Sequence, residues 1–365
     1  MAELGKLNRL QLKNYKSIKK LDIELGRLNI LLGQNGAGKS NFISFFKLMN
    51  KLLNKDLQLY VGEQGVDRLL HFGRKNSKKL ELHLEFLPNG YGATLVPTPD
   101  DRLIFKEEYA EFFAERVHYS GGYKRKELAS AGSVESSLPA SNNASIAGHV
   151  SGYIADWKVY HFHDTSETAL VKAPCDINDN DWLRPQADNL SAFLYAIKDT
   201  SAYEKIVRTV QRVAPFFQDF VLRPDKLNQE RIRLRWKHKG NDEYFDAHAL
   251  SDGTLRFICM ATLLLQPHLP TIILLDEPEL GLHPYAIQIL AGLMKSASHK
   301  TQVIASTQSV TLANEFSWQD IVVVQQEANA SEFHRLEEDK IKPWLESYEM
   351  GDIWQKNLIG GNPSC

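Results

Sequence analysis

Residues 28–40, LNILLGQNGAGKS, join an apolar run to a glycine-rich pattern. The run Leu28–Leu32 is almost continuously apolar and ends at a glycine, as expected for a central strand of a parallel sheet buried on both faces. The pattern G-x-x-x-x-G-K-S requires glycines, because its backbone N–H groups must approach phosphate oxygens without a Cβ in the way. This stretch therefore predicts an α/β phosphate-loop fold that binds a nucleotide.

The loop and the helix expected after it, over residues 39–53, share the work of holding a triphosphate. Lys39 is expected to neutralise the β and γ phosphates, and the Ser40 hydroxyl to bind Mg²⁺. A glycine-rich turn before any helix could give this pattern by chance, but its place between an apolar strand and an amphipathic helix favours nucleotide binding. The candidate nucleotide-binding residues here are Asn35, Gly36, Gly38, Lys39, Ser40 and Asn41.

Two further apolar runs, residues 271–275 and 301–305, end in polar segments of their own. The first is followed by DEPE at 276–279 and the second by STQS at 306–309. In an open α/β sheet the ligand lies at the carboxyl ends of the strands. We therefore expect both segments to converge with the phosphate loop.

The two adjacent carboxylates after the first of these runs have separate tasks. Asp276 can hold Mg²⁺, and Glu277 can polarise an attacking water. An acidic cap for the helix expected near Pro284 would need only one acidic residue. The pair therefore favours nucleotide hydrolysis.

The pentamer LSDGT, residues 250–254, precedes an apolar helical pattern. Ser251 is a good N-cap for that helix, which is the simpler explanation of the pentamer. Alternatively, the Ser251 hydroxyl, the Gly253 N–H and the helix dipole form a second anion site. Because residues 33–40 already cradle one set of phosphates, such a site makes sense across a two-fold interface, where each subunit completes its partner's pocket.

The motifs GQNGAGKSN, LSDGT, LLDEPELGLHP and STQS together resemble the ABC-type ATPase heads of the RecF, SMC and OLD group, called AAA family ATPases in bacterial genomes. The opening LQLKNYKSIKKLDIELGRLNILLGQNGAGKSN is also typical of RecF-like heads. The resemblance implies a mixed sheet with an antiparallel flank and an inserted helical lobe. It also implies ATP and Mg²⁺ as ligands, and a cytoplasmic protein that dimerises on ATP.

Position by position, the resemblance assigns Lys39 and Ser40 to phosphate and Mg²⁺, Asp276 to Mg²⁺ and Glu277 to the general base. Ser251 and Gly253 would contact the γ-phosphate of the partner subunit. Two departures stand out: LSDGT replaces the LSGGQ of transporter ATPases, and Gln308 replaces the switch histidine common in ABC heads. Gln308 can orient water or phosphate but cannot act as an acid.

Two shorter segments resemble one bacterial subfamily of these ATPases, VYHFHDTS at 159–166 and IGGNP at 359–363. Members of that subfamily often lie beside TOPRIM-like partner proteins in probable phage-defence loci. The resemblance therefore suggests an antiviral role with an effector protein acting in trans.

The chain divides into four predicted regions. Residues 1–100 and 246–330 form the two halves of the ATPase core, 101–245 an inserted helical lobe, and 331–365 a C-terminal extension. Within the lobe, residues 120–147 are rich in Gly, Ser, Ala and Asn, which predicts a flexible loop. Hairpins are expected at 80–96 and 232–245 and are assigned to the antiparallel flank.

Composition limits the cellular compartment and the kinds of partner that we expect for the protein. The 43 Lys and Arg residues nearly balance 45 Asp and Glu residues, so no global basic field indicates nucleic acid or an anionic membrane. Cys175, Cys259 and Cys365 are odd in number and widely spaced, which argues against a disulfide framework and fits a reducing cytoplasm. The longest apolar run, residues 257–265, is too short to span a bilayer.

Two weaker patterns leave their alternatives open. His161 and His163 would share one face of a strand, as metal ligands or as polar residues packed at a strand end. Alternate basic residues could form a nucleic-acid track or a solvated sheet face. These residues are Arg231, Arg233, Arg235, Lys237 and Lys239.

The sequence as a whole predicts an ATP-hydrolysing dimer switch for a partner effector. One alternative is an ATP-binding scaffold with negligible turnover, which Gln308 leaves open while Glu277 favours the enzyme. Another is a RecF-like DNA-repair ATPase, which would require hydrolysis stimulated by DNA.

Overall fold

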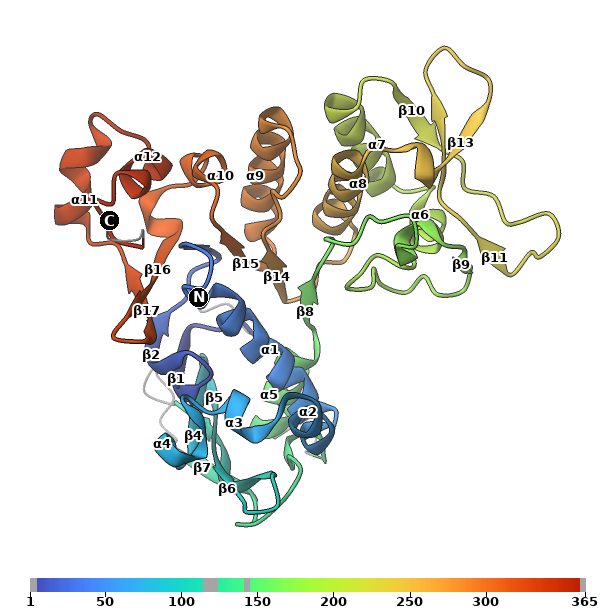
Figure 1. Cartoon of the computed structure of the whole chain (residues 1–365). Coiled ribbons are helices and arrows are strands. Elements are labelled where there is room, and N and C mark those ends of the chain that lie inside the picture. Colours follow the sequence, from blue (N-terminus) through green and yellow to red (C-terminus); the bar gives the residue numbers. More distant parts are fainter. Residues whose placement is uncertain (1–4, 114–123, 141–144, 362–365) are drawn as a thin grey trace.

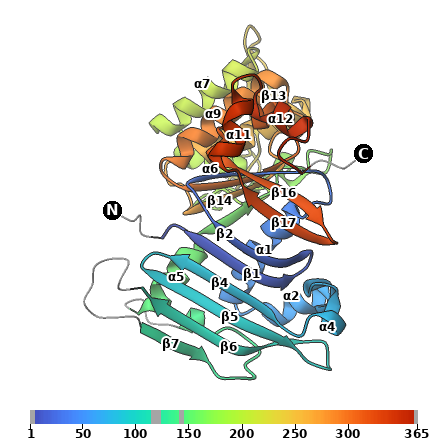
Figure 2. The same ribbon diagram turned by 90° about the vertical axis from the view of Figure 1, so that its left-hand side faces the viewer.

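The computed structural model describes residues 5–113, 124–140 and 145–361, which form two six-stranded sheets (Figures 1 and 2). Sheet A has the order β2-β1-β4-β5-β6-β7 and its pairs are antiparallel. Sheet B has the order β17-β16-β3-β15-β14-β8 and is parallel except for β17. This arrangement confirms the predicted α/β fold with a mixed sheet.

The strands of sheet A are β1 Arg9–Tyr15, β2 Ile18–Glu24, β4 Leu80–Phe86, β5 Asn89–Pro97, β6 Leu103–Phe112 and β7 Lys124–Ala129. Those of sheet B are β3 Leu28–Leu32, β8 Trp157–Tyr160, β14 Ile272–Asp276, β15 Gln302–Thr307, β16 Ile321–Glu327 and β17 Ala330–Arg335. The apolar runs that predict central strands are β3, β14 and β15, and they lie side by side.

Both faces of sheet B are covered, as its continuous apolar strands predict. Alternate residues such as Ile30, Ile273 and Val303 belong to one core, and their neighbours Leu31 and Ile272 belong to the other. Helix α1 (Lys39–Leu53) packs in the second core between the two sheets, and α8 (Asp252–Leu265) and α9 (Pro284–Ser298) cover the opposite face (Figure 1). The sheet therefore holds the carboxyl ends of its strands in a fixed position.

The remaining helices flank these layers. Beside sheet A lie α2 Leu57–Gln64, α3 Val66–Leu69, α4 Gly73–Asn76 and α5 Ile146–Ala155, and after β15 come α10 Val310–Asn314, α11 Glu338–Leu345 and α12 Met350–Gln355. None of the helices in the described ranges is long and apolar enough to cross a lipid bilayer. Cys175 and Cys259 are buried free thiols, and Cys365 lies outside those ranges.

The predicted lobe 101–245 is distributed over three places. Strands β6 and β7 extend sheet A, and β8 is the edge strand of sheet B. Helix α5 lies beside sheet A. The elements after β8 form a unit beside α8 (Figure 1), made of β9 Cys175–Asp176, α6 Leu190–Ile197, α7 Ser201–Val213, β10 Phe217–Phe220, β11 Arg231–Ile232, β12 Arg235–His238 and β13 Tyr244–Asp246. The helices expected at 188–213 are present, while the division of the chain into four regions stays a prediction.

Two expectations about the flank and the loop need correction. The hairpin β4–β5 belongs to sheet A, but β12–β13 belongs to a separate three-stranded sheet with β10. Of the predicted flexible loop, residues 120–123 and 141–144 lie outside the described ranges, and Lys124–Ala129 is strand β7. There Arg125 pairs with Glu107 and lies 3.5 Å from the ring centroid of Tyr109, contacts that composition does not reveal.

Candidate functional site

Three loops meet at the carboxyl edge of sheet B, where the sequence predicts convergence. The N–H of Gly33, at the start of the glycine-rich loop, donates to the carbonyl of Thr307 at 3.3 Å. The N–H of Glu277 donates to the carbonyl of Ser306 at 3.0 Å. The segments 33–40, 276–279 and 306–309 therefore form one continuous polar edge.

The glycines of the loop shape the start of α1 for an anion. Gly38 is the N-cap residue, with φ at 113°, and Gly36 has φ at 81°, so both occupy conformations that favour glycine. Because Gly38 has no side chain, nothing from the cap residue occupies the N–H groups of the first turn. Those groups and the helix dipole make a ready site for phosphate.

Lys39 is buried in this loop, with 4 % of its surface exposed. Its Nζ donates to the carbonyl oxygens of Gly33 at 2.6 Å and Gln34 at 2.9 Å. Burial lowers the pKa of Lys39, and the nearby carboxylates of Glu277, Asp276 and Glu279 oppose that shift. The ammonium is thus held by the loop's own backbone beside the acidic segment.

The acid pair is anchored to the next strand. Asp276 ends β14 and accepts a hydrogen bond from the hydroxyl of Ser306, which is fully buried. Glu277 follows with φ at 43°, a conformation that is costly for a residue with a side chain. The fold therefore constrains the direction in which the Glu277 carboxylate leaves the strand.

Gln308 lies between two residues with fixed hydrogen bonds. Before it, the Thr307 hydroxyl accepts from the Ser309 N–H at 2.9 Å and donates to Glu279. After it, Ser309 caps α10 by accepting from the N–H of Leu312 at 3.1 Å. The predicted switch residue is thus partly exposed at the same edge as Lys39 and Asp276.

Ser251 and Gly253 lie apart from this edge. Ser251 is exposed and caps α8, where its hydroxyl accepts from the N–H of Thr254 at 3.3 Å. A Cβ on Gly253 would lie 2.5 Å from the carbonyl of Gly281, so this glycine lets α8 pack against the loop that follows DEPE. Within the described residues no hydrogen bond joins Ser251 to residues 33–40.

His161 and His163 follow β8 and are not on a strand, which corrects the prediction. Tyr160 pairs with Leu275 in the parallel register, so His161 comes next to Asp276 at the same edge. Burial lowers the pKa of His161 to about 4, with Lys47 also lowering it and Asp276 opposing. Across the described residues, no cluster of three or more His, Cys, Asp or Glu could hold a metal ion.

The basic residues of the predicted track alternate as expected, with Ile232 and Trp236 buried on the other side. The charges of Arg233, Arg235 and Lys237, however, are paired with aspartates of the lobe. Arg235 lies 2.9 Å from Asp225, and Arg233 lies 3.8 Å from Asp225 and 3.7 Å from Asp246. This pairing favours the solvated, self-neutralised face over a nucleic-acid track.

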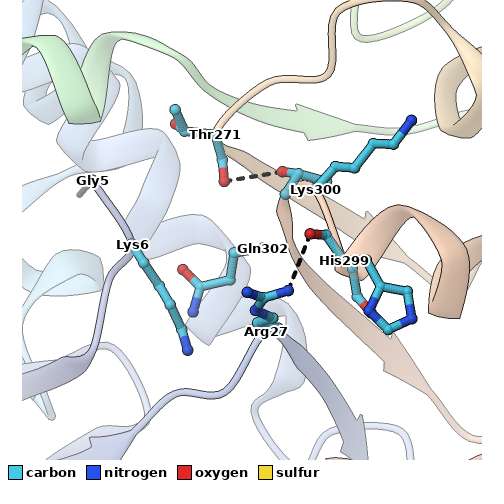
Figure 3. A pocket seen from close by; sticks show the side chains of 9 residues that line it. Gly5, Lys6, Arg27, Thr271, His299, Lys300 and Gln302 are labelled. Atoms are coloured by element: carbon cyan, nitrogen blue, oxygen red, sulfur yellow. Dashed lines mark hydrogen bonds between the residues drawn. The ribbon is translucent and has the colours of Figure 1, made fainter. Parts of the chain in front are cut away.

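Two of the cavities in the described part of the chain bear on the site. One of about 560 Å³ adjoins the phosphate loop and is lined by Lys16, Ser17, Asn41, Gln64, Asp67, Arg68, Leu70, His71, Phe72, Gln326 and Asn329. The other, of about 260 Å³, lies where β14 and β15 begin (Figure 3). There Gln302 donates to the carbonyls of Leu7 and Gly26, which is a structural role at the edge remote from the phosphate loop.

Some residues at the site carry signals that sequence reasoning did not use. Glu279 and Thr307 lie inside the quoted segments DEPE and STQS, where only their neighbours have assigned roles. Asn41 was a candidate, and its Nδ2 donates to the hydroxyl of Ser17 at 2.7 Å, which ties α1 to the turn between β1 and β2. Ser17 itself has no motif that would identify it.

Solved structures share the fold of this chain. The Smc head bound to the C-winged helix domain of ScpA superposes with a TM-score of 0.59 at 16% identity, over 92% of this chain and 99% of that one. A Pyrococcus furiosus Smc head with an extended coiled coil, bound to the C-terminal domain of ScpA, gives 0.53 at 17% identity, over 93% and 98%. A Pyrococcus yayanosii Smc head with a coiled coil and joint gives 0.53 at 12% identity, over 93% and 99%. No curated protein matches the sequence.

The described residues form a phosphate-loop NTPase fold of the ABC type, the fold of SMC heads. Residues 28–314 match the family model described as "AAA domain, putative AbiEii toxin, Type IV TA system". The chain belongs to that family, which confirms the part of the resemblance that concerns AAA family ATPases.

Proposed function

We propose that this protein is a Mg²⁺-dependent ATPase whose two copies close around ATP. The proposal rests on one observation: the expected nucleotide-binding residues lie on two separate parts of the chain. Lys39, Asp276 and Glu277 lie together at one edge of sheet B, while Ser251 is exposed on another element. A second copy could bring its Ser251 and Gly253 to the γ-phosphate of the first, because the site of one chain lacks them.

The residues at the edge fit a bound nucleotide and Mg²⁺. Ser40 is exposed beside Lys39, and Asp276 is an oxygen donor of the kind that Mg²⁺ prefers. Mg²⁺ would supply charge neutralisation for the phosphates. Glu277 accepts a proton from the attacking water, Lys39 stabilises phosphate charge, and Gln308 orients the water by hydrogen bonds.

The cavity of about 560 Å³ beside the loop suits the nucleoside part of ATP. It shares Asn41 with the phosphate-binding segment, so a nucleotide can extend from one into the other. Its wall includes Phe72, whose side chain is 58% exposed. An aromatic ring in that position can stack on a base.

The exposed loop between DEPE and α9 fits the surface that closure would bury. Leu280 and Tyr285 are apolar side chains with 45% and 46% of their surfaces exposed. Leu280 lies close to α8, because Arg256 of that helix donates to its carbonyl at 2.8 Å, and Tyr285 lies in the first turn of α9. Exposed apolar side chains next to Ser251 support an interface at this face.

The role of the switch is proposed from family and analogy. A family described as a putative toxin of a type IV toxin–antitoxin system, together with the VYHFHDTS segment, supports control of an effector protein, TOPRIM-like or other, in phage defence in the cytoplasm. Smc heads with ScpA domains bound show that this fold can carry a partner protein. A RecF-like role on DNA receives less support, since the arginines of the lobe are paired with aspartates.

The test is sedimentation of Glu277→Gln with Mg²⁺ and ATP. Removing the general base while keeping its shape should trap an ATP-bound dimer, and the wild type should return to monomer as ATP is consumed. Lys39→Ala is the matched control and should stay monomeric. A monomeric Glu277→Gln protein at saturating ATP would refute closure, and a dimer with no wild-type turnover would support the scaffold alternative.

A further inference from the structure

The second glutamate of DEPE, Glu279, has a buried carboxyl group, one oxygen of which has no hydrogen-bond partner among the described residues. Only 8% of its surface is exposed. Its Oε1 accepts a hydrogen bond from the Thr307 hydroxyl, while Oε2 is buried and has no hydrogen-bond partner among the described residues. Burying such a group costs free energy, so its retention at this place calls for a role.

The partner of Glu279 is a junction of the site. Thr307 is fully buried at the end of β15. Its hydroxyl accepts from the N–H of Ser309 at 2.9 Å as it donates to Glu279, and its carbonyl accepts from the N–H of Gly33 at 3.3 Å. Glu279 is therefore linked through Thr307, by two hydrogen bonds in each direction, to Ser309 and to Gly33 at the start of the phosphate loop.

The charges around Glu279 indicate that an uncharged side chain of the same shape, such as glutamine, could replace it as the hydrogen-bond acceptor of Thr307. Burial raises the pKa of Glu279 to about 6, and the neighbouring Glu277 also raises it. Hydrogen bonding from the Thr307 hydroxyl and from the backbone of Glu279 and Gln308 lowers it. Lys39 is the cation in this group. A hydrogen-bond acceptor for Thr307 is needed here, whereas a second full negative charge beside Glu277 is not favoured.

We infer that Glu279 is a positioning residue, which through Thr307 fixes Gln308 and the entrance of the phosphate loop in one arrangement. The inference rests on the proposed ATPase function and assigns a positioning role at the same site to one more residue. Glu279 need not touch ATP. When Thr307 loses the carboxyl acceptor, its hydroxyl can turn away from Ser309, and Gln308 loses the direction that the two bonds impose.

The first experiment compares Glu279→Gln with Glu279→Ala in steady-state ATP hydrolysis by the full-length protein. The glutamine keeps an acceptor for Thr307, so its kcat should stay within about 3-fold of the wild type. The alanine should lower kcat about 10-fold or more with KM changed less than about 2-fold, because positioning is lost and phosphate binding is not. Equal losses in both variants would overturn the inference and assign Glu279 a charge-dependent role.

A second pair of variants tests the route through Thr307. Thr307→Val keeps the shape and removes the hydroxyl, so it should lower kcat as Glu279→Ala does. If Glu279 acts through Thr307 and Gln308, the double variants Glu279→Ala with Thr307→Val and with Gln308→Ala should be no slower than the worse single variant. Additive losses would mean that these residues act separately, which contradicts the inference.

Failure of this inference can be told apart from failure of the proposed function. If the wild type does not hydrolyse ATP, the ATPase proposal falls, and amide hydrogen exchange then tests the network in the absence of ATP. Glu279→Ala should speed exchange of the Ser309 and Gly33 amides about 10-fold and leave α9 unchanged, with Glu279→Gln close to wild type. Unchanged exchange at both amides would overturn the inference.

Discussion

The N-termini of α1 and α8 are both suited to anions, yet the fold treats them in opposite ways. At α1 the cap is Gly38, the first lysine is buried, and two other loops reach the same edge. At α8 the cap is Ser251, which is exposed and bonds within its own turn. The N-terminus of α1, the assembled end, is surrounded by other loops of the same chain, whereas the N-terminus of α8, the outward end, is exposed at the surface.

The difference follows from what each cap residue does with the free N–H groups of a helix. Glycine at 38 leaves those groups to a ligand, and its left-handed conformation would strain any other residue. Serine at 251 already satisfies the N–H of Thr254 in the free chain. An anion at α8 would therefore have to replace a cap worth about 1 kcal/mol. In the proposed dimer, the second subunit would hold that anion in place.

The largest effect is expected from a substitution at the N-terminus of α1. Lys39→Ala removes the buried ammonium and leaves the carbonyls of Gly33 and Gln34 without their donor. Loss of a hydrogen-bonded charge of this kind should weaken ATP binding roughly 100-fold. Calorimetric titration with ATP measures it, and Lys47→Ala, an exposed lysine on the same helix, is the control. Similar affinities for the two variants would contradict the assignment of Lys39.

The next prediction tests whether the outward end is completed in trans. Ser251→Arg and Lys39→Ala should each be inactive alone, because every dimer then has two damaged sites. Mixed in equal amounts, the two variants can form dimers that contain one of each, and such a dimer carries one intact site. ATP hydrolysis should therefore recover in part, to the order of a quarter of the wild-type rate. A mixture that stays as inactive as its components would exclude trans completion.

The sequence predicts some parts of the fold and of the assembled end, and not others. Strand periodicity and the loop pattern predict β3, β14 and β15 and the convergence of Lys39, Asp276 and Ser306, because local signals and a parallel sheet determine both. The path of β7 and the place of His161 depend on pairing with distant strands, which local pattern does not contain. Thr307 gains its importance only from contacts with Gly33 and Glu279.

A third prediction contrasts a buried carboxyl at the assembled end with an exposed one at the outward end. The pKa of Glu279 is raised from 4.5 to about 6, so its stabilising protonated form is complete below pH 4.5 and is lost as the pH rises through about 6. Glutamine does not ionise, so the Glu279→Gln variant does not lose stability in this way. The free energy of unfolding of the variant relative to wild type should therefore rise by about 2 kcal/mol between pH 4.5 and pH 7.5.

Urea unfolding of both proteins across this pH range measures the difference. Asp252→Asn is the control, because Asp252 is exposed in the first turn of α8 and its replacement should cost about 0.5 kcal/mol through the helix dipole. A stability difference between Glu279→Gln and wild type that does not change with pH would contradict the burial of an ionisable group at this edge.

The smallest effect is expected in the lobe beside α8, where charge is abundant but already paired. Replacing Arg231, Arg233 and Arg235 by glutamine removes partners of Asp225 and Asp246 and a hydrogen bond to the carbonyl of Pro174. Because Arg233 and Arg235 are paired with aspartates and Arg231 is bonded to a carbonyl, the affinity for duplex DNA should change less than about 2-fold, with the same slope against salt concentration. A flatter slope with weaker binding would instead show that the arginines contact phosphates, and an anion surface would then exist outside both helix ends.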